Sequence, residues 1–390
     1  MKKIAIVLSL VLLLLGFAIF LVYRIVGDIR PAILPPLKNL SQELTQKTGD
    51  KPSIPLILPE GFSIGVFAKN VPGVRDLEFS SGGTLLASLP GEGKVVSLVD
   101  TNADGKSDEM RTTISNLIRP HGLSFYKKKL FVAEETKVSR YSFDEKTSTA
   151  TFDKKLFDLP PGGRHKTRSI TFDTKGNMYV SLGSTCDTCI EKDSFIATVL
   201  ISDSEGASPQ IYSTGLRNAV FLEYDKNTDT LWSTEMGRDF LGDNLPPDEI
   251  NILQKDGNYG WPYCYGDKIW DSKFGRQNQL YCNNTIQPFY NIPAHSAPLG
   301  LAIIKSKQMP DDWQGDLLVA YHGSWNRSIP TGYKVVRVST KNQSESDFLT
   351  GFIEGSSASG RPVDLEFDKN GSLYLSDDKA NAVYKIVKNM

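Results

Sequence analysis

Histidine is scarce in this chain, and every histidine stands beside an apolar segment that alternates like a β-strand. The chain has 390 residues and four histidines. His121, His165 and His295 come shortly before such segments, and His322 comes directly after one. A neutral imidazole can take a proton from a hydroxyl group near neutral pH. Each histidine is therefore a candidate general base, with a purely structural role as the alternative.

Basic residues occupy similar places along the chain. They precede the first strand of a repeat or follow His322, and they are Arg75, Arg217, Arg361, Arg327 and Lys334. If these strand ends converge, the basic groups form a ring. A guanidinium group binds a carboxylate through two hydrogen bonds, so such a ring favours a ligand with several carboxylates. The alternative is that the arginines pair with acidic neighbours such as Asp76 and Asp364.

Two acidic loops are candidate cation sites. One matches positions 1, 3, 5 and 9 of an EF-hand calcium loop with Asp100, Asn102, Asp104 and Asp108. Position 12 is Arg111 rather than glutamate, so the match is partial and an unliganded turn is the alternative. The other loop carries Asp239, Asp243, Asp248 and Glu249.

Six similar hairpins supply the elements that would position these residues. They lie at residues 77–88, 123–133, 170–181, 221–233, 301–320 and 363–376. Most are about 45–50 residues apart, and no long amphipathic helix interrupts them. This pattern predicts an all-β, six-bladed β-propeller, with a β-sandwich pair or another β-solenoid as the alternative. Residues 237–293 are too long for a plain connection and predict an insertion at the mouth of the site.

The first residues predict a membrane anchor. Lys2 and Lys3 precede an apolar run from Ile4 to Val22, which at ~1.5 Å per residue approaches the ~30 Å thickness of the hydrocarbon layer. A small-x-small cleavage site is lacking, which favours an uncleaved transmembrane helix in residues 1–26 over a cleaved signal peptide. Residues 27–54 are rich in proline and predict a linker. Residues 55–390 would then form the propeller on the extracytoplasmic side.

Cysteine content and charge agree with an exported protein. Cys186 and Cys189 enclose a short loop, and Cys264 and Cys282 flank another. An even number of cysteines in an exported domain favours two disulfides. Zinc binding would need thiolates from distant loops, and thioredoxin-like chemistry would need a βαβ context. The net charge of −1 gives no support for nucleic-acid binding.

Several strings together resemble a known family. They are Gly-Leu-Arg-Asn at 215–218, the segments 242–251 and 257–266, His-Ser-Ala-Pro-Leu-Gly at 295–300, His-Gly-Ser-Trp-Asn-Arg at 322–327, and Gly-Arg-Pro-Val-Asp at 360–364. Over about residues 55–388 the chain resembles the PQQ-dependent glucose/sorbosone dehydrogenases, especially the sorbosone and pyranose dehydrogenase branch. The placing of the four cysteines is similar to that branch as well.

The resemblance implies a fold, two cofactors and a set of site residues. It implies a six-bladed propeller that binds PQQ, a tricarboxylate, with Ca²⁺ and oxidises a sugar hydroxyl or hemiacetal. His165 would be the catalytic base, with His295 or His322 as alternatives. Cofactor contacts would come from Arg217, Asn218, Lys334 and Arg361, and further from Arg75, His295, His322 and Arg327. The carbonyl groups of Gly237 and Arg238 would bind the calcium ion.

Three functions are therefore compared. The first is a membrane-anchored sugar dehydrogenase that passes electrons to a quinone or cytochrome acceptor. The second is a non-enzymatic surface propeller that binds a glycan or a partner protein. The third is a lactonase-type hydrolase, which ranks last because it needs acidic calcium ligands at the axis, whereas the strand starts carry arginine and histidine.

Overall fold

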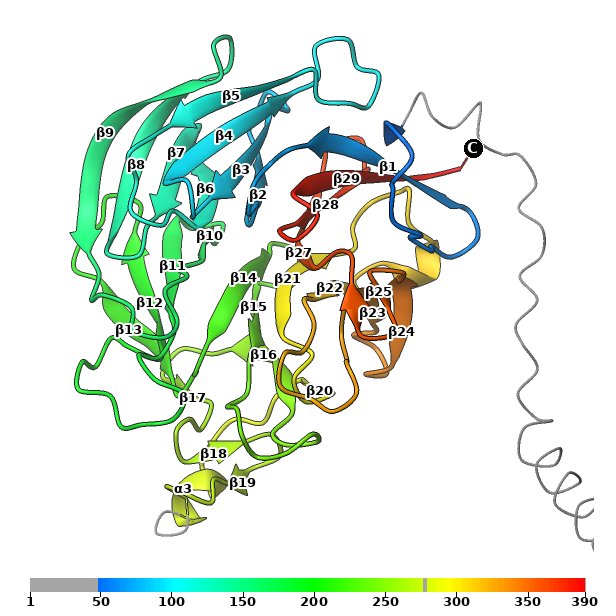
Figure 1. Cartoon of the computed structure of the whole chain (residues 1–390). Coiled ribbons are helices and arrows are strands. Elements are labelled where there is room, and N and C mark those ends of the chain that lie inside the picture. Colours follow the sequence, from blue (N-terminus) through cyan, green and yellow to red (C-terminus); the bar gives the residue numbers. More distant parts are fainter. Residues whose placement is uncertain (1–47, 276–278, 390) are drawn as a thin grey trace, which may run out of the picture. The chain divides into compact units, whose positions relative to one another are not determined.

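The six predicted hairpins form the inner halves of six blades arranged around a common axis (Figure 1). The computed structural model describes residues 48–275 and 279–389. The predicted anchor, residues 1–26, and the linker up to residue 47 lie outside them. Within the described ranges, we find no helix with the length and apolar character needed to span a bilayer. The prediction of an all-β, six-bladed propeller is confirmed.

Each blade is an antiparallel sheet whose first strand is innermost. The strands of the first blade are β2 (Leu77–Phe79), β3 (Leu85–Leu89), β4 (Lys94–Val99) and β5 (Glu109–Ile114). The second blade has β6 (Gly122–Tyr126), β7 (Lys129–Ala133), β8 (Lys137–Asp144) and β9 (Thr149–Asp158). The third has β10 (Ile170–Phe172), β11 (Asn177–Leu182), β12 (Thr198–Asp203) and β13 (Gln210–Thr214), and β17 (Gly257–Asn258) joins it in parallel to β13.

The remaining blades follow the same order. The fourth has β14 (Ala219–Asp225), β15 (Thr230–Glu235), β16 (Asp248–Leu253) and β20 (Tyr290–Ile292). The fifth has β21 (Pro298–Ile303), β22 (Leu317–Tyr321), β23 (Lys334–Val338) and β24 (Glu345–Leu349). The sixth has β27 (Pro362–Phe367), β28 (Leu373–Asp377), β29 (Ala382–Lys388) and, at its edge, β1 (Phe62–Lys69). Two short ribbons are β18 (Cys264–Tyr265) with β19 (Ile269–Trp270), and β25 (Ile353–Glu354) with β26 (Ser357–Ala358).

The ring is closed by pairing the first described strand with the last one. β1 pairs antiparallel with β29, and Phe62 lies opposite Lys388. Before β1, Asp50 forms a bridge with Val66 and an ion pair with Lys69 at 2.7 Å. The part of the predicted linker from residue 48 onward therefore packs against the propeller.

Local sequence explains the hairpins. Apolar residues of the inner strands pack between neighbouring blades, as Phe79 of β2 does against Tyr374 of β28, with ring centroids 5.1 Å apart. At the turn after β27, Gly371 has φ +86°, and Asp368 accepts hydrogen bonds from two backbone N–H groups. Glycine adopts this left-handed conformation without strain, which fixes the tight turn between the strands.

The predicted insertion is shorter than residues 237–293. The strands β16 and β20 fall within that range but complete the fourth blade. In the extra chain between them, β17 joins the third blade, whereas the β18–β19 ribbon and the short helix α3 (Gln279–Asn283) project from the fourth blade (Figure 1). A single 3₁₀ turn, η1 (Asp311–Trp313), precedes β22.

Candidate functional site

A cavity of about 240 Å³ lies at the end of the propeller where the inner strands begin. Its walls come from loops of the third, fourth and fifth blades. The lining residues are Arg164, His165, Arg217, Asn218, Met236, Gly237, Asp239, Asp248, His295, Ala297, Trp325 and Asn326. The structure thus brings seven of the predicted residues to one cavity: His165, Arg217, Asn218, Gly237 and His295, and Asp239 and Asp248 of the second acidic loop.

The imidazole of His165 is held by a single neighbouring residue. Its Nδ1 lies 3.0 Å from the carbonyl oxygen and 2.9 Å from the Oγ of Ser184. A carbonyl oxygen only accepts hydrogen bonds, so Nδ1 carries the proton and Nε2 has the free lone pair. Burial, followed by the charge of Arg217, lowers the pKa of His165 to about 3. The ring is therefore neutral at physiological pH and can accept a proton at Nε2.

Arg217 is almost fully buried beneath the cavity, with 4% of its side chain exposed. Its Nε and Nη2 donate to the carbonyl oxygen and to Oδ1 of Asp187, each at 2.8 Å, and its Nη1 donates to Met236. Asp239 lies 3.5 Å from Nη2 and also pairs with Arg164 at 2.5 Å. The two arginines of the cavity are thus balanced by two carboxylates.

The turn after β15 presents two backbone carbonyl groups. Neither Gly237 nor Arg238 uses its carbonyl oxygen as a hydrogen-bond acceptor within the described chain. Asp248 fixes the turn, because its two oxygens accept from the backbone N–H groups of Gly237 and Ala297 at 2.8 and 2.9 Å. Burial raises the pKa of Asp248 to about 7. Free carbonyl oxygens beside a buried carboxyl group are ligands that calcium prefers.

A second group of predicted residues lies at the starts of β2 and β27 and after β22, outside the lining of this cavity. Asp378 pairs with Arg75 and with Nε2 of His322, both at 2.9 Å. Arg361 donates to the carbonyl oxygens of His322 and Gly323 and lies over the Tyr333 ring. No carboxylate of the described ranges forms an ion pair with Arg361. Its charge is therefore available to an anionic ligand.

The other predicted contacts are dispersed. His295 Nε2 contacts the carbonyl oxygen of Gly242 at 2.8 Å, and Arg327 donates to Ala294 and Asn244. Lys334 does not line the cavity, since its Nζ pairs with Asp347 at 2.6 Å and with Glu345. His121 is buried near the axis, with its Nδ1 against Arg168 and its ring edge on Phe221.

The EF-hand-like loop lies at the far end of the first blade, between β4 and β5. The carboxylates of Asp100, Asp104 and Asp108 accept hydrogen bonds from the loop's own backbone. Among the residues described, the one group of three His, Cys, Asp or Glu ligand atoms within 4.8 Å of one another is Cys186, Cys189 and Glu191. Asn102 Nδ2 lies 3.3 and 3.4 Å from the carboxylates of Asp104 and Asp108, so these predicted residues are neighbours, and calcium binding by this loop stays a prediction.

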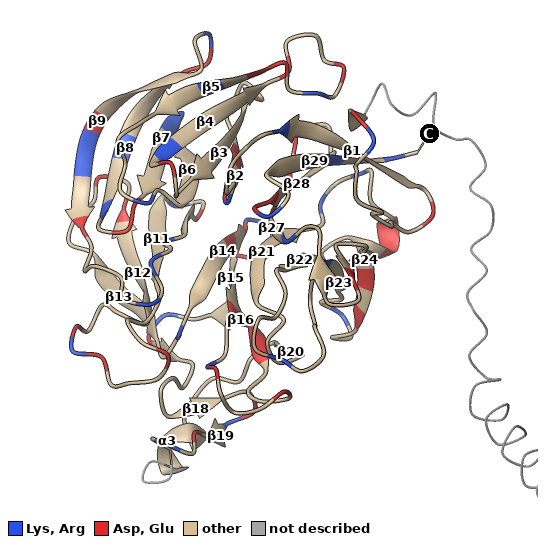
Figure 2. Ribbon diagram, viewed as in Figure 1, with Lys and Arg blue, Asp and Glu red and all other residues tan. Residues whose placement is uncertain are grey.

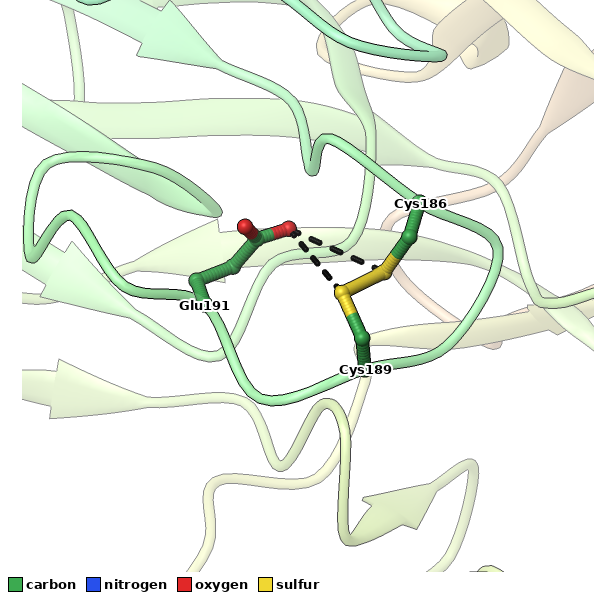
Figure 3. A group of neighbouring side chains, drawn as sticks. All are labelled: Cys186, Cys189 and Glu191. Atoms are coloured by element: carbon green, nitrogen blue, oxygen red, sulfur yellow. Dashed lines mark hydrogen bonds between the residues drawn. A yellow bond between two sulfur atoms is a disulfide. The ribbon is translucent and has the colours of Figure 1, made fainter.

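Both predicted disulfides are confirmed. Cys186 is bonded to Cys189, and Cys264 is bonded to Cys282. The first closes a short loop beside the cavity (Figure 3), and the second ties the β18–β19 ribbon to α3.

Three half-buried glutamates further along the inner strands had no role in the sequence-based predictions. Glu78, Glu223 and Glu366 occupy the same place in β2, β14 and β27, each between two apolar residues. Burial raises the pKa of Glu78 to about 8, with Glu223 from the opposite blade contributing, and raises that of Glu223 to about 7. The strand starts carry basic residues as expected, but the axis is acidic further in.

Charge elsewhere is mixed. Basic and acidic residues are interspersed over the blades (Figure 2). This mixture of charges agrees with the net charge of −1.

The fold and cavity can now be compared with known proteins. The model of the TrAA12-like family matches residues 56–389. The chain belongs to this family. The resemblance inferred from the sequence strings is confirmed, because proteins similar to this chain include PQQ-dependent sugar dehydrogenases.

Two relatives and one solved structure illustrate the similarity. An uncharacterized protein of Borreliella burgdorferi is 28% identical over 354 residues, which are 85% of this chain and 90% of that protein. The pyrroloquinoline quinone-dependent pyranose dehydrogenase of Coprinopsis cinerea is 24% identical over 87% of this chain, but this match spans only 55% of the fungal protein. The holo structure of its PQQ domain superposes with a TM-score of 0.74 at 21% identity, covering 86% of this chain and 98% of that domain.

Proposed function

We propose that this protein is a PQQ- and calcium-dependent dehydrogenase that oxidises a hydroxyl or hemiacetal group of a sugar. The observation that carries the proposal is His165, a neutral imidazole in a cavity with its protonated nitrogen fixed by Ser184. Its Nε2 makes no hydrogen bond within the described chain. This is the arrangement that a general base for a sugar hydroxyl needs.

The residues around the cavity fit the two cofactors. Arg217 and Asn218 would contact PQQ at the cavity, and Arg361 would bind a PQQ carboxylate near the axis. The carbonyl groups of Gly237 and Arg238 would bind Ca²⁺. The ion would supply positive charge at the cavity, because Asp187 and Asp239 already balance Arg164 and Arg217 there. The relatives' PQQ dependence supports this assignment.

When bound, PQQ would supply the oxidant that accepts a hydride from the sugar carbon. The chain contributes the base and its position. Gly183 separates His165 from Asn218, and a Cβ there would lie 2.6 Å from the Cβ of His165 and 2.7 Å from Oδ1 of Asn218. The glycine therefore lets the base and the amide pack closely, and His165 Nε2 takes the hydroxyl proton.

The mouth of the cavity suits a sugar ring. Trp325 lines the cavity and is 64% exposed, and Phe240 beside it is 69% exposed. Their rings meet edge to face with centroids 6.0 Å apart. Exposed aromatic rings at a polar rim mark a binding surface.

Location and electron transfer form part of the same proposal. The apolar run at residues 4–22 supports an anchor that holds the propeller outside the cytoplasmic membrane, where a quinone or cytochrome would accept the electrons. Proteolysis of intact cells and membrane fractionation test the anchor.

Sugar-dependent reduction of an artificial electron acceptor tests the activity. The purified protein, loaded with PQQ and Ca²⁺, should reduce the dye with an aldose or pyranose but not without PQQ. Loaded, folded protein that oxidises no sugar would contradict the proposal and favour a surface propeller that only binds glycans or a partner.

A further inference from the structure

A disulfide loop, residues 184–191, contacts both the proposed base and the buried arginine beneath the cavity. The loop follows β11 and contains the Cys186–Cys189 bond, with Glu191 beside the two sulfur atoms (Figure 3). These contacts come from different parts of the loop, so its conformation determines two features of the site at once.

The first contact fixes the tautomer of His165. Ser184 has one hydroxyl hydrogen, and it is donated to the carbonyl oxygen of Cys186 at 2.7 Å. The Ser184 oxygen can then only accept from His165 Nδ1, as its carbonyl oxygen also does. Both acceptors require the proton on Nδ1. The Ser184 carbonyl oxygen alone already requires this tautomer, and the Cys186 carbonyl oxygen, by taking the hydroxyl hydrogen, excludes the alternative in which Ser184 Oγ donates to Nδ1. The conformation of the loop therefore keeps both acceptors of Ser184 at His165.

The second contact holds Arg217. Asp187 lies between the two cysteines and accepts from Arg217 through its carbonyl oxygen and its carboxylate. The same Oδ1 accepts from the backbone N–H of Asp239 at 2.9 Å. Moving Asp187 would therefore release the guanidinium group and the loop that follows β15.

Glu191 fastens the start of the loop. Its carboxylate accepts from the backbone N–H and the hydroxyl of Thr185, both at 2.7 Å. Its Oε1 lies 3.8 and 3.6 Å from the sulfur atoms of Cys186 and Cys189. Thr185 in turn accepts from the backbone N–H of Arg164, next to the base. The disulfide and this carboxylate together give the loop one shape.

We propose that the Cys186–Cys189 disulfide is a positioning element for catalysis, which fixes the tautomer of His165 and the orientation of Arg217, so that breaking it lowers turnover while the propeller stays folded. This inference rests on the proposed function for its activity measurements, but the tautomer can be observed without activity.

The second disulfide provides a matched control. The stabilisation from closing a loop grows with loop length. Cys264 and Cys282 are 18 residues apart, whereas Cys186 and Cys189 are 3 apart. Neither Cys264 nor Cys282 bonds to His165 or Arg217. The C264S/C282S variant should therefore lose more thermal stability, and the C186S/C189S variant should lose more activity.

The experiment compares both double variants with the wild type in the full chain loaded with PQQ and Ca²⁺. For C186S/C189S we expect kcat to fall by about 10- to 100-fold, with a smaller change in KM for the sugar. The acid limb of kcat/KM should move to higher pH as the freed imidazole becomes hydrated. A dithiol should have the same effect on the wild type, because it gives two electrons and two protons to the disulfide and is itself oxidised to one.

Nitrogen NMR of ¹⁵N-histidine protein gives the independent reading. The chain has four histidines, so the His165 signals can be assigned with H165Q. The wild type should show one Nδ1–H tautomer, and C186S/C189S should show a mixture.

An unchanged tautomer and unchanged kcat in folded C186S/C189S would overturn the inference, as would an equal loss of kcat in C264S/C282S. If wild-type protein oxidises no sugar but the tautomer still depends on the disulfide, the proposed function fails and the positioning role stands.

Discussion

The two halves of the inner strands differ in how they bury charge. At the strand starts, Arg217 is paired with Asp187 and Asp239, and Arg75 is paired with Asp378. A few residues further along, Glu78, Glu223 and Glu366 face one another without such partners. In β2 and β14, a paired arginine at the start of the strand is thus followed by a glutamate without an ion-pair partner.

The presence or absence of an ion-pair partner determines which charges persist in each region. Paired charges stay ionised when buried, so the mouth keeps guanidinium groups that an anionic cofactor can contact. Unpaired carboxyl groups respond to burial with raised pKa values and are neutral until the pH rises. The glutamates along the axis bear on the hydrolase alternative, because a hydrolase of that type needs acidic calcium ligands. Their ligand atoms form no group of three within 4.8 Å in the described residues, so they do not favour it.

The largest effect should come from removing the base at the mouth. H165Q should lower kcat by about 10²- to 10⁴-fold while PQQ still binds. Because the pKa of His165 is about 3, wild-type kcat/KM should show no acid limb near pH 6.5 from this residue. H121Q is the matched control, because burial likewise lowers the pKa of His121 to about 3 but the residue does not line the cavity. Equal losses in both variants would contradict the assignment of the base.

Arg361, the unpaired cation at the start of β27, should have the next largest effect. R361A should weaken PQQ binding by about 10- to 100-fold, since a hydrogen bond to a charged group contributes about 1.5–3 kcal/mol. R361K should recover only part of the affinity, because lysine lacks the planar fork. Absorbance titration measures both. An unchanged dissociation constant in R361A would place the cofactor away from the axis.

A smaller effect should follow from filling the calcium turn. In G237A the new Cβ would lie 2.7 Å from Pro246 Cγ and 2.8 Å from the Pro247 carbonyl oxygen. The turn must shift, so the calcium concentration needed for half-maximal PQQ binding should rise by about tenfold, or 1.4 kcal/mol. G91A is the control, because nothing lies within 4 Å of a Cβ there. Identical calcium dependence in the two variants would remove this turn from the site.

The smallest effect concerns stability at the axis. The folded-state pKa of Glu78 is raised to about 8, so its contribution to stability is fully present below its unfolded value near 4.5 and is lost as the pH rises through 8. E78Q should therefore raise Tm at pH 8 by about 2 °C for each kcal/mol recovered, and change it little at pH 4. E60Q, at an exposed site, should show no such dependence. If E78Q had a lower Tm than the wild type at pH 8, this result would contradict the claim that Glu78 has no ion-pair partner.

The fold could be predicted from the sequence, but the site could be predicted only in part. Period-two alternation is local, and so the six hairpins could be predicted from it. Partners that lie far apart in the chain could not: Asp378 meets Arg75 across 303 positions, and Lys334 pairs with strand β24 rather than the cavity. The axial acids did leave a signal, because Leu-Glu-Phe occurs at both 77–79 and 365–367. Their meaning depends on ring closure, which brings opposite blades together.

Calcium-dependent binding of PQQ tests the central claim most directly. The metal-free purified protein is titrated with PQQ, with and without Ca²⁺, and the quinone absorbance is followed. We predict saturable binding with Ca²⁺ and loss of binding when the ion is chelated. Absence of binding at micromolar PQQ and saturating Ca²⁺, in protein shown to be folded, would contradict the dehydrogenase account.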